Sequence, residues 1–139
     1  MTLSSGQVNE VDVLFEVRAV FARYEAALVA NDVAALNAFF WTSAHTVRYG
    51  LAEHGYGINS IAAQRAALTP VHPERRLGKL VITTLGADLA SVAAEFSAPD
   101  SPRIGRQTQV WARFAEGWRI VAAHVSTVEP GVARSCDSG

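Results

Sequence analysis

The apolar residues of this chain change their period part way along, and that change constrains the fold more than any other feature. In the first third they recur at the three- and four-residue intervals of a helix, at Val13, Leu14, Val17, Val20, Phe21, Tyr24 and Leu28. From Lys79 onward the chain shows long segments rich in β-formers, joined by short turns that contain glycine. Helices followed by paired strands predict an α+β fold.

Local signals divide these regions into elements. We expect the first helix to stop at Asn31, and Asp32 is a suitable N-cap for a second helix over residues 33–40. A third helix should begin at Asn59 or Ser60 and end before Pro70. The expected strands cover residues 45–52, 79–85, 89–98, 106–114 and 118–127. Three N-terminal helices should therefore pack on a curved, mostly antiparallel sheet and form a cone-shaped barrel.

Length and charge limit the class of protein. The 139 residues fit a single domain with a core over about residues 8–128 and a loose tail after about Pro130. A net charge of -1 argues against binding to nucleic acid or to an anionic membrane. Charged residues make up only 18%, so we expect part of the surface to be buried in a homo-oligomer. Neither a membrane span nor a secretion signal is evident, and the expected location is cytoplasmic.

We expect no metal and no other cofactor. The single cysteine, Cys136, excludes an intrachain disulfide and lies in the tail, where we expect it to be inert. None of the spacings H-x-H or H-E-x-x-H occurs among the histidines, which are His45, His54, His72 and His124. The pair Arg75 and Arg76 is expected in a solvated loop.

Two polar residues in apolar surroundings could carry chemistry. Tyr24 lies in the helical stripe, so its phenol should point inward, either to a functional partner or simply to a backbone carbonyl. Arg48 lies in the middle of the strand predicted at 45–52. If it points inward without a dedicated carboxylate, it indicates a pocket for an anionic ligand. The alternatives are an outward-facing Arg48 and a pair with Glu53.

The terminal hairpin supplies further candidates. If Phe114 lies opposite Trp118, then Val110 faces Ala122, Thr108 faces His124 and Arg106 faces Ser126. We expect this face to be a pocket wall, with His124 either in the pocket or as a core or subunit-contact residue. The opposite face should form a subunit interface and carries Gln107, Gln109, Trp111, Arg113, Arg119, Val121, Ala123 and Val125. Tyr56, in a tight Gly-Tyr-Gly turn, could line the pocket rim.

Three segments together resemble a known family. They are RYEAAL (23–28) with NDV (31–33), the stretch from FW (40–41) to TVRYG (46–50), and GRQTQ (105–109) with GWRIVAAHVS (117–126). In combination they are similar to the AtzH-like family of the nuclear-transport-factor-2-like (SnoaL-like, cystatin-like) superfamily. This resemblance implies a cone that assembles through its sheet as dimers or tetramers.

The resemblance also implies an activity. Members are associated with the catabolism of nitrogen-rich small molecules, alongside amidases, and the best-defined activity is a decarboxylating amidohydrolase that converts 1,3-dicarboxyurea to allophanate. The catalytic Tyr and Arg of that activity correspond to Tyr24 and Arg48.

The chain departs from the family pattern on the pocket side. It has Ala44 where the family usually has Pro, and His54-Gly55 where it usually has Asn-Leu. In the third helix, Gln64-Arg65-Ala66-Ala67 keeps only the first Arg of a Phe-Arg-x-x-Arg pattern.

These considerations lead to a hypothesis and two alternatives. The hypothesis is hydrolysis of a small carboxylated urea or acidic amide, in which Arg48 binds the substrate carboxylate and Tyr24 exchanges a proton. Arg106, His124 and Tyr56 would make further substrate contacts. One alternative is a non-catalytic anion-binding or accessory subunit for an amidase. The other is a ketosteroid-isomerase-like or cyclase-like enzyme, for which His124 is the candidate base.

Overall fold

The computed structural model describes residues 2–135, which contain three α-helices, a short 3-10 helix and a six-stranded sheet. The helices are η1 (Ser5–Gln7), α1 (Val11–Ala30), α2 (Val33–Ala38) and α3 (Ile58–Ala67). The strands are β1 (Val47–Tyr49), β2 (His54–Tyr56), β3 (Arg76–Leu85), β4 (Leu89–Ala98), β5 (Ser101–Phe114) and β6 (Gly117–Val128). None of the helices in this range has the length and apolarity that crossing a membrane requires.

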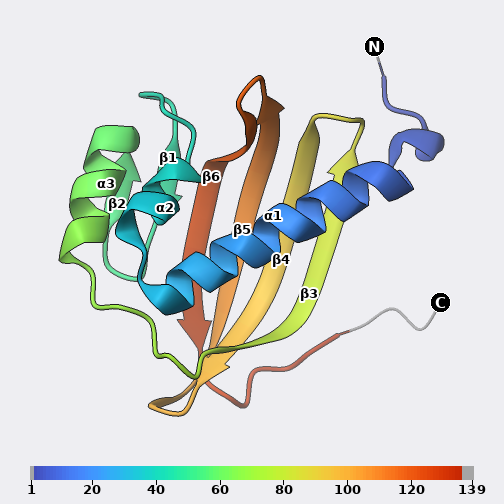
Figure 1. Cartoon of the computed structure of the whole chain (residues 1–139). Coiled ribbons are helices and arrows are strands. Elements are labelled where there is room, and N and C mark those ends of the chain that lie inside the picture. Colours follow the sequence, from blue (N-terminus) through green and yellow to red (C-terminus); the bar gives the residue numbers. More distant parts are fainter. Residues whose placement is uncertain (1, 136–139) are drawn as a thin grey trace.

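The sheet has the order β2-β1-β6-β5-β4-β3. All neighbouring strands are antiparallel except β1 and β6, which run parallel. Register shifts in the β3–β4, β4–β5 and β5–β6 pairs bend the long strands, as β-bulges do. Figure 1 shows α1 running obliquely across one face of this curved sheet, with α2 and α3 beside β1 and β2. The predicted α+β class, with helices on a mostly antiparallel sheet, is confirmed.

The helix signals in the sequence act as expected. Asn31 ends α1 in the left-handed conformation with φ 51°, and its N–H bonds back to the carbonyls of the last turn. The Asp32 carboxylate accepts the Ala35 N–H at 3.1 Å and caps α2. The third helix differs from expectation, because it starts directly after Gly57 rather than at Asn59 or Ser60. Gly57 has φ 86°, a conformation that glycine adopts without strain.

The core lies between α1 and the sheet. We call the sheet face beneath α1 the inner face and the opposite one the outer face. The inner face is apolar at its centre, where Val92, Trp111 and Ile120 have no exposed surface. The buried stripe of α1 covers it, through Val13, Val17, Val20, Phe21, Tyr24, Ala27 and Leu28.

The two faces of the terminal hairpin are the reverse of the prediction. Gln107, Gln109 and Trp111 are buried on the inner face, not in a subunit interface. Thr108 and His124 are cross-strand partners as predicted, but both are exposed on the outer face. The glutamines face inward because each has a buried polar partner, which a strand pattern does not reveal.

The hairpin register is also wrong at its turn end. Val110 pairs with Ala122 and Arg106 with Ser126 as predicted, but Phe114 pairs with Gly117 rather than Trp118. The register shifts between Val110 and Trp111, so that one extra residue enters β6. The sequence prediction also omitted β2, which forms a short antiparallel hairpin with β1.

Gly105 and Phe96 give a test of the sheet packing. They are cross-strand partners, and a Cβ at Gly105 would lie 2.1 Å from the Phe96 ring. Gly105→Ala should therefore cost about 1–3 kcal/mol in chemical unfolding, since overpacking outweighs the gain of roughly 0.5–1 kcal/mol from replacing a strand glycine.

The control is Gly78→Ala, whose Cβ would approach only to 3.4 Å of Glu95. It should be neutral or slightly stabilising. Adding Phe96→Ala to Gly105→Ala should remove the coupling between the two positions. Equal effects of Gly78→Ala and Gly105→Ala would contradict the close packing of Gly105 against Phe96.

Candidate functional site

Arg48 lies on the inner face of β1 and is only 8% exposed. Its Nη1 donates to Glu53 Oε1 at 2.9 Å, so Arg48 points inward but has a carboxylate partner, as in the alternative of a pair with Glu53. The β1–β2 turn is shaped for this pair, because a Cβ at Gly50 would lie 1.8 Å from the same Glu53 oxygen. Among residues 2–135, Glu53 is the one hydrogen-bond partner of this guanidinium, so its remaining N–H groups can serve a ligand.

Tyr24 lies on the buried side of α1 and is 4% exposed. Its ring meets Phe39, Phe40 and Trp111 edge-on, at centroid distances of 5.7, 6.4 and 6.1 Å. These contacts fix the ring in place. Within residues 2–135, no hydrogen bond of its hydroxyl is present.

A row of paired residues connects Tyr24 to Arg48 across the inner face. Trp111 packs against Tyr24 and donates from Nε1 to Gln109 Oε1 at 2.9 Å. Gln109 is paired with Ala123 on β6, and Ala123 is paired with Arg48 on β1. Arg48, Ala123 and Gln109 therefore lie side by side on three neighbouring strands, and Tyr24 contacts this row through Trp111. We call this part of the inner face, with the side chains that cover it, the inner region. Gln109 was not predicted as a site residue, because its strand face was expected to form a subunit interface.

A second polar network lies next to Tyr24. The Glu25 carboxylate accepts from Gln107 Nε2 at 2.7 Å and from Arg75 Nε at 3.1 Å. Arg75 also stacks on the Phe96 ring, 3.9 Å from its centroid. The prediction of a solvated loop is wrong in part for both arginines. Arg75 lies in the loop before β3, but these contacts bury its side chain. Arg76 is exposed, but it is the first residue of β3. The network ties α1, β5 and the segment before β3 together.

The other predicted site residues lie on the outer face or edge of the sheet. His124 and Tyr56 flank Tyr49, which contacts both rings at centroid distances of 5.9 Å. The hydroxyls of Tyr49 and Tyr56 are 3.1 Å apart, and this hydrogen bond raises the pKa of Tyr56 above its ordinary value. Tyr56 and His124 line a shallow hollow of about 400 Å³ at the β1–β2 hairpin. The structure thus brings these two together, but on the opposite side of the sheet from Tyr24.

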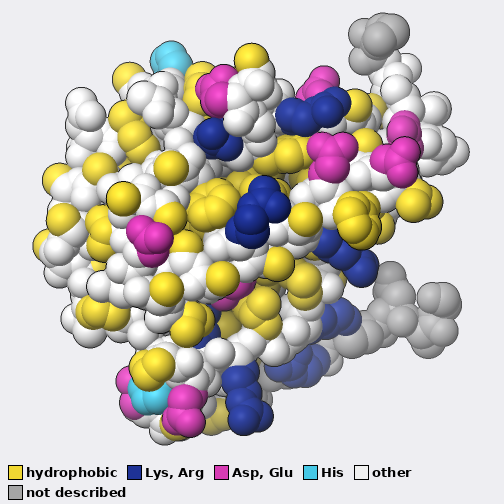
Figure 2. Space-filling view, viewed as in Figure 1, with side chains coloured by type: hydrophobic (Ala, Val, Ile, Leu, Met, Phe, Trp, Pro, Cys, Tyr) yellow, Lys and Arg dark blue, Asp and Glu magenta, His cyan; other side chains and the backbone are white. Residues whose placement is uncertain are grey.

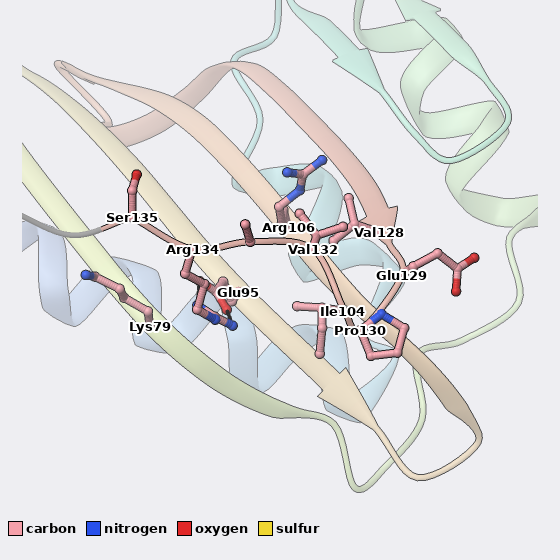
Figure 3. Close-up of a pocket in the computed structure, with 11 residues that line it drawn as sticks. Lys79, Glu95, Ile104, Arg106, Val128, Glu129, Pro130, Val132, Arg134 and Ser135 are labelled. Atoms are coloured by element: carbon pink, nitrogen blue, oxygen red, sulfur yellow. Dashed lines mark hydrogen bonds and ion pairs between the residues drawn. The ribbon is translucent and has the colours of Figure 1, made fainter.

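Arg106 is also on the outer face, farther along β5, where the C-terminal segment crosses the sheet. Figure 3 shows this segment passing over the strands with Arg134 beside Glu95. Arg134 Nη1 lies 2.6 Å from Glu95 Oε2, and this contact lowers the pKa of Glu95. The segment and the sheet enclose a hollow of about 290 Å³ that Arg106 also lines. Cys136, which was expected to be inert, lies outside the described residues.

The surface that carries α1 bears charges of both signs. Figure 2, viewed from this side, shows acidic and basic side chains intermixed with apolar ones. In the part of the chain that the structure describes, no group of His, Cys, Asp and Glu could hold a metal ion. The side chains that could bind a ligand on the inner face are instead guanidinium, phenol and amide groups.

Comparison with known proteins places the chain in context. The model of the AtzH-like family matches residues 6–131. A cystatin-like fold protein from Burkholderia xenovorans LB400 is 48% identical, with a TM-score of 0.86 over 88% of this chain and 96% of that one. A protein of unknown function from Pectobacterium atrosepticum SCRI1043 is also 48% identical, with a TM-score of 0.89 over 92% of this chain and 100% of that one.

More distant structures share the fold. An NTF2-like protein of unknown function from Pseudomonas putida KT2440 is 17% identical, with a TM-score of 0.70 over 84% of this chain and 87% of that one. No curated protein matches the sequence.

The Arg134–Glu95 contact gives a pH prediction. Because the pKa of Glu95 is lowered in the folded chain, docking of the C-terminal segment is favoured above the ordinary pKa of 4.5 and lost as the pH falls through the lowered value. Arg134→Gln should move the Glu95 pKa up toward its ordinary value in a carboxyl NMR titration.

The matched control is Arg103→Gln, since Arg103 pairs with Glu129 and not with Glu95. It should leave the Glu95 pKa unchanged. A Glu95 pKa that does not respond to Arg134→Gln would contradict the docked segment.

Proposed function

Because the chain belongs to the AtzH-like family, we propose that it is a cofactor-independent decarboxylating amidohydrolase that acts on a small carboxylated urea such as 1,3-dicarboxyurea. One observation carries the proposal. The inner region holds a phenol, Tyr24, with no hydrogen-bond partner among the described residues, and a guanidinium, Arg48, that is only partly occupied by Glu53. A proton donor and an anion-binding group are what this reaction requires.

Arg48 acts as the electrostatic group in this mechanism. Its unoccupied N–H groups bind the urea carbonyl or the carboxylate next to it. When the bond between nitrogen and the carboxyl carbon breaks, its electron pair passes to nitrogen and delocalises onto the carbonyl oxygen. A fixed guanidinium stabilises that charge, because it needs no reorientation as the charge develops. Glu53 holds Arg48 in place through the 2.9 Å ion pair.

Tyr24 supplies the proton. The carboxyl group leaves as carbon dioxide, or as bicarbonate after attack by water, and the nitrogen takes the proton of the Tyr24 hydroxyl. Water then returns a proton to the phenolate, so that one substrate dianion and one proton give allophanate and carbon dioxide. Packing against Phe39, Phe40 and Trp111 holds the ring, which lowers the entropy cost of the transfer.

The partners of this function are a small anionic substrate and, as the family resemblance suggests, an amidase acting in the same catabolic sequence. The ketosteroid-isomerase-like alternative loses its candidate base, because His124 is exposed on the outer face. An accessory subunit would bind the anion at the same inner site but would not turn it over. The activity assay therefore distinguishes it from the enzyme.

Tyr24→Phe tests the proton donor. Phenylalanine keeps the three ring contacts, so folding should be retained, while turnover should fall about 10²–10⁴-fold without the hydroxyl. Carbon dioxide and allophanate are measured from freshly prepared 1,3-dicarboxyurea, with a protein-free control for spontaneous decay. Wild-type turnover that survives Tyr24→Phe would remove Tyr24 from the mechanism.

Arg48→Lys tests the guanidinium in the same assay. Lysine keeps the charge but not the planar fork, so turnover should also be lost. Arg113→Lys, at an exposed surface pair with Asp88, is the control and should behave as wild type. Substrate binding without turnover by the wild-type protein would favour the accessory subunit, and neither binding nor turnover would overturn both.

We also propose that a second copy of the chain covers the exposed part of the outer face. Val110, Ala122 and His124 line a shallow hollow there, and Val110 is 37% exposed at the centre of the sheet. Apolar side chains in a row on an uncovered sheet are typical of an interface.

Val110→Asp should then convert a homo-oligomer to monomers in analytical ultracentrifugation, because it places a charge in the contact. Glu116→Gln, in the exposed β5–β6 turn, is the control. A wild-type protein that is monomeric at high micromolar concentration would contradict the proposal.

A further inference from the structure

The charges at the inner region do not balance. Three guanidinium groups are buried there, those of Arg48, Arg65 and Arg75. Within the described residues, their carboxylate partners are Glu53 for Arg48 and Glu25 for Arg75. Arg65 has none. This leaves one buried positive charge more than the protein itself neutralises.

Arg65 is on the buried side of α3 and is 9% exposed. Its Nη2 atom is shielded from solvent and has no hydrogen-bond partner within residues 2–135. A guanidinium cannot lose its charge at physiological pH, so burial without a partner is unfavourable. The last turn of α3, where Arg65 lies, offers only the partial negative charge of a helix end.

The missing hydrogen bonds concentrate in the same region. Among the described residues, four buried side-chain atoms have no partner, and three of them are Arg65 Nη2, Asn37 Oδ1 and Gln64 Oε1. The fourth, Thr84 Oγ1, is on β3. Asn37 is on α2 and Gln64 on α3, and these two helices pack against each other. An unpaired donor with unpaired acceptors is the pattern of a site that binds a polar molecule carrying both an anionic group and N–H groups.

This region adjoins Arg48. A Cβ at Gly55 would lie 2.9 Å from both Ile61 and Gln64 of α3, so the helix packs directly over Gly55. Gly55 is the cross-strand partner of Arg48. Arg65 follows Ile61 by one helical turn, about 5–6 Å along the axis, and both side chains are buried.

We propose that Arg65 is a second anion-binding residue of the inner site and selects substrates that carry a second carboxylate. This inference rests on the proposed function, in which Arg48 binds near the reacting end of a small carboxylated urea. Arg65 then binds the carboxylate at the far end, which does not react. The guanidinium fork suits a carboxylate, and the pairing satisfies the Nη2 donor that the protein leaves without a partner.

The test uses an unreactive pair of probes. Glutarate is a dianion with the same three-atom spacing between carboxyl groups as 1,3-dicarboxyurea, and butyrate is the same chain with one carboxylate removed. Calorimetry should show that the wild-type protein binds glutarate about 10–100-fold more tightly than butyrate. In Arg65→Gln this preference should fall to near one, while Arg65→Lys should retain part of it.

Arg23→Gln controls for the loss of one positive charge. Arg23 is exposed on α1, and its substitution should leave the preference for glutarate unchanged. Thermal stability gives a second readout, because a purely structural role of Arg65 predicts a different result when Arg65 is replaced. Without ligand, Arg65→Leu should raise the midpoint of thermal unfolding, because it removes a buried unpaired charge. An unchanged glutarate preference in Arg65→Gln, or a large loss of stability in Arg65→Leu, would overturn the proposal.

The inference and the proposed function can fail separately. Turnover of 1,3-dicarboxyurea with the same KM in Arg65→Gln as in wild type would refute the role of Arg65 and leave the activity standing. Glutarate binding that depends on Arg65, with no turnover of 1,3-dicarboxyurea, would refute the activity and leave the dianion site standing.

Discussion

The burial of Trp111 on the inner face determines much of the remaining structure. This side chain has no exposed surface, packs against Tyr24 and Phe39, and donates to Gln109 at 2.9 Å. Burying an indole contributes roughly 4–6 kcal/mol, which is a large part of the stability of a small domain. Every second side chain of a strand lies on the same face, so Gln109 and Gln107 point inward together with Trp111. The inward position of Trp111 and that of the two glutamines are therefore one property of β5, which the contacts of all three side chains determine together.

That coupling explains which parts of the fold the sequence predicts. The signals for α1 and α2 are local, because Asn31 and Asp32 act on the backbone within four or five residues. The face of β5 that points inward is not a local property. It depends on whether Gln107 has a buried partner, and that partner, Glu25, lies 82 residues away. When this contact is not known, the alternation of Gln with Thr and Val in β5 favours placing Thr108 and Val110 inward. The prediction therefore exchanged the inner and outer faces of the hairpin.

The residues of the candidate site also fall into those that the sequence predicts and those that it does not. Tyr24 and Arg48 could be identified because each is a polar residue within an apolar pattern, whichever face the distant strands present. Gln109 and Arg75 could not, because their burial depends on contacts with α1 and between strands. The two faces of the hairpin were predicted the wrong way round, so His124 was predicted on the pocket wall and Gln109 in a subunit interface. In the structure His124 is exposed on the outer face and Gln109 is buried on the inner face.

Two of the buried arginines differ in what they contribute: Arg75 stabilises the free protein, whereas the charge of Arg65 is available to bind a ligand. Arg75 has a carboxylate, an amide and an aromatic ring around it, and these contacts join three elements of the fold. The guanidinium of Arg65 does not connect elements of the fold in this way, because its Nη2 has no partner. An apolar side chain of similar volume at this position would make the folded protein more stable. A residue that lowers the stability of the free protein gains a partner when an anion binds, so the anion stabilises the folded chain by mass action. The stability of α3 and the inner region should therefore depend on ligand more strongly than that of the Glu25–Arg75–Gln107 network, which is complete without one.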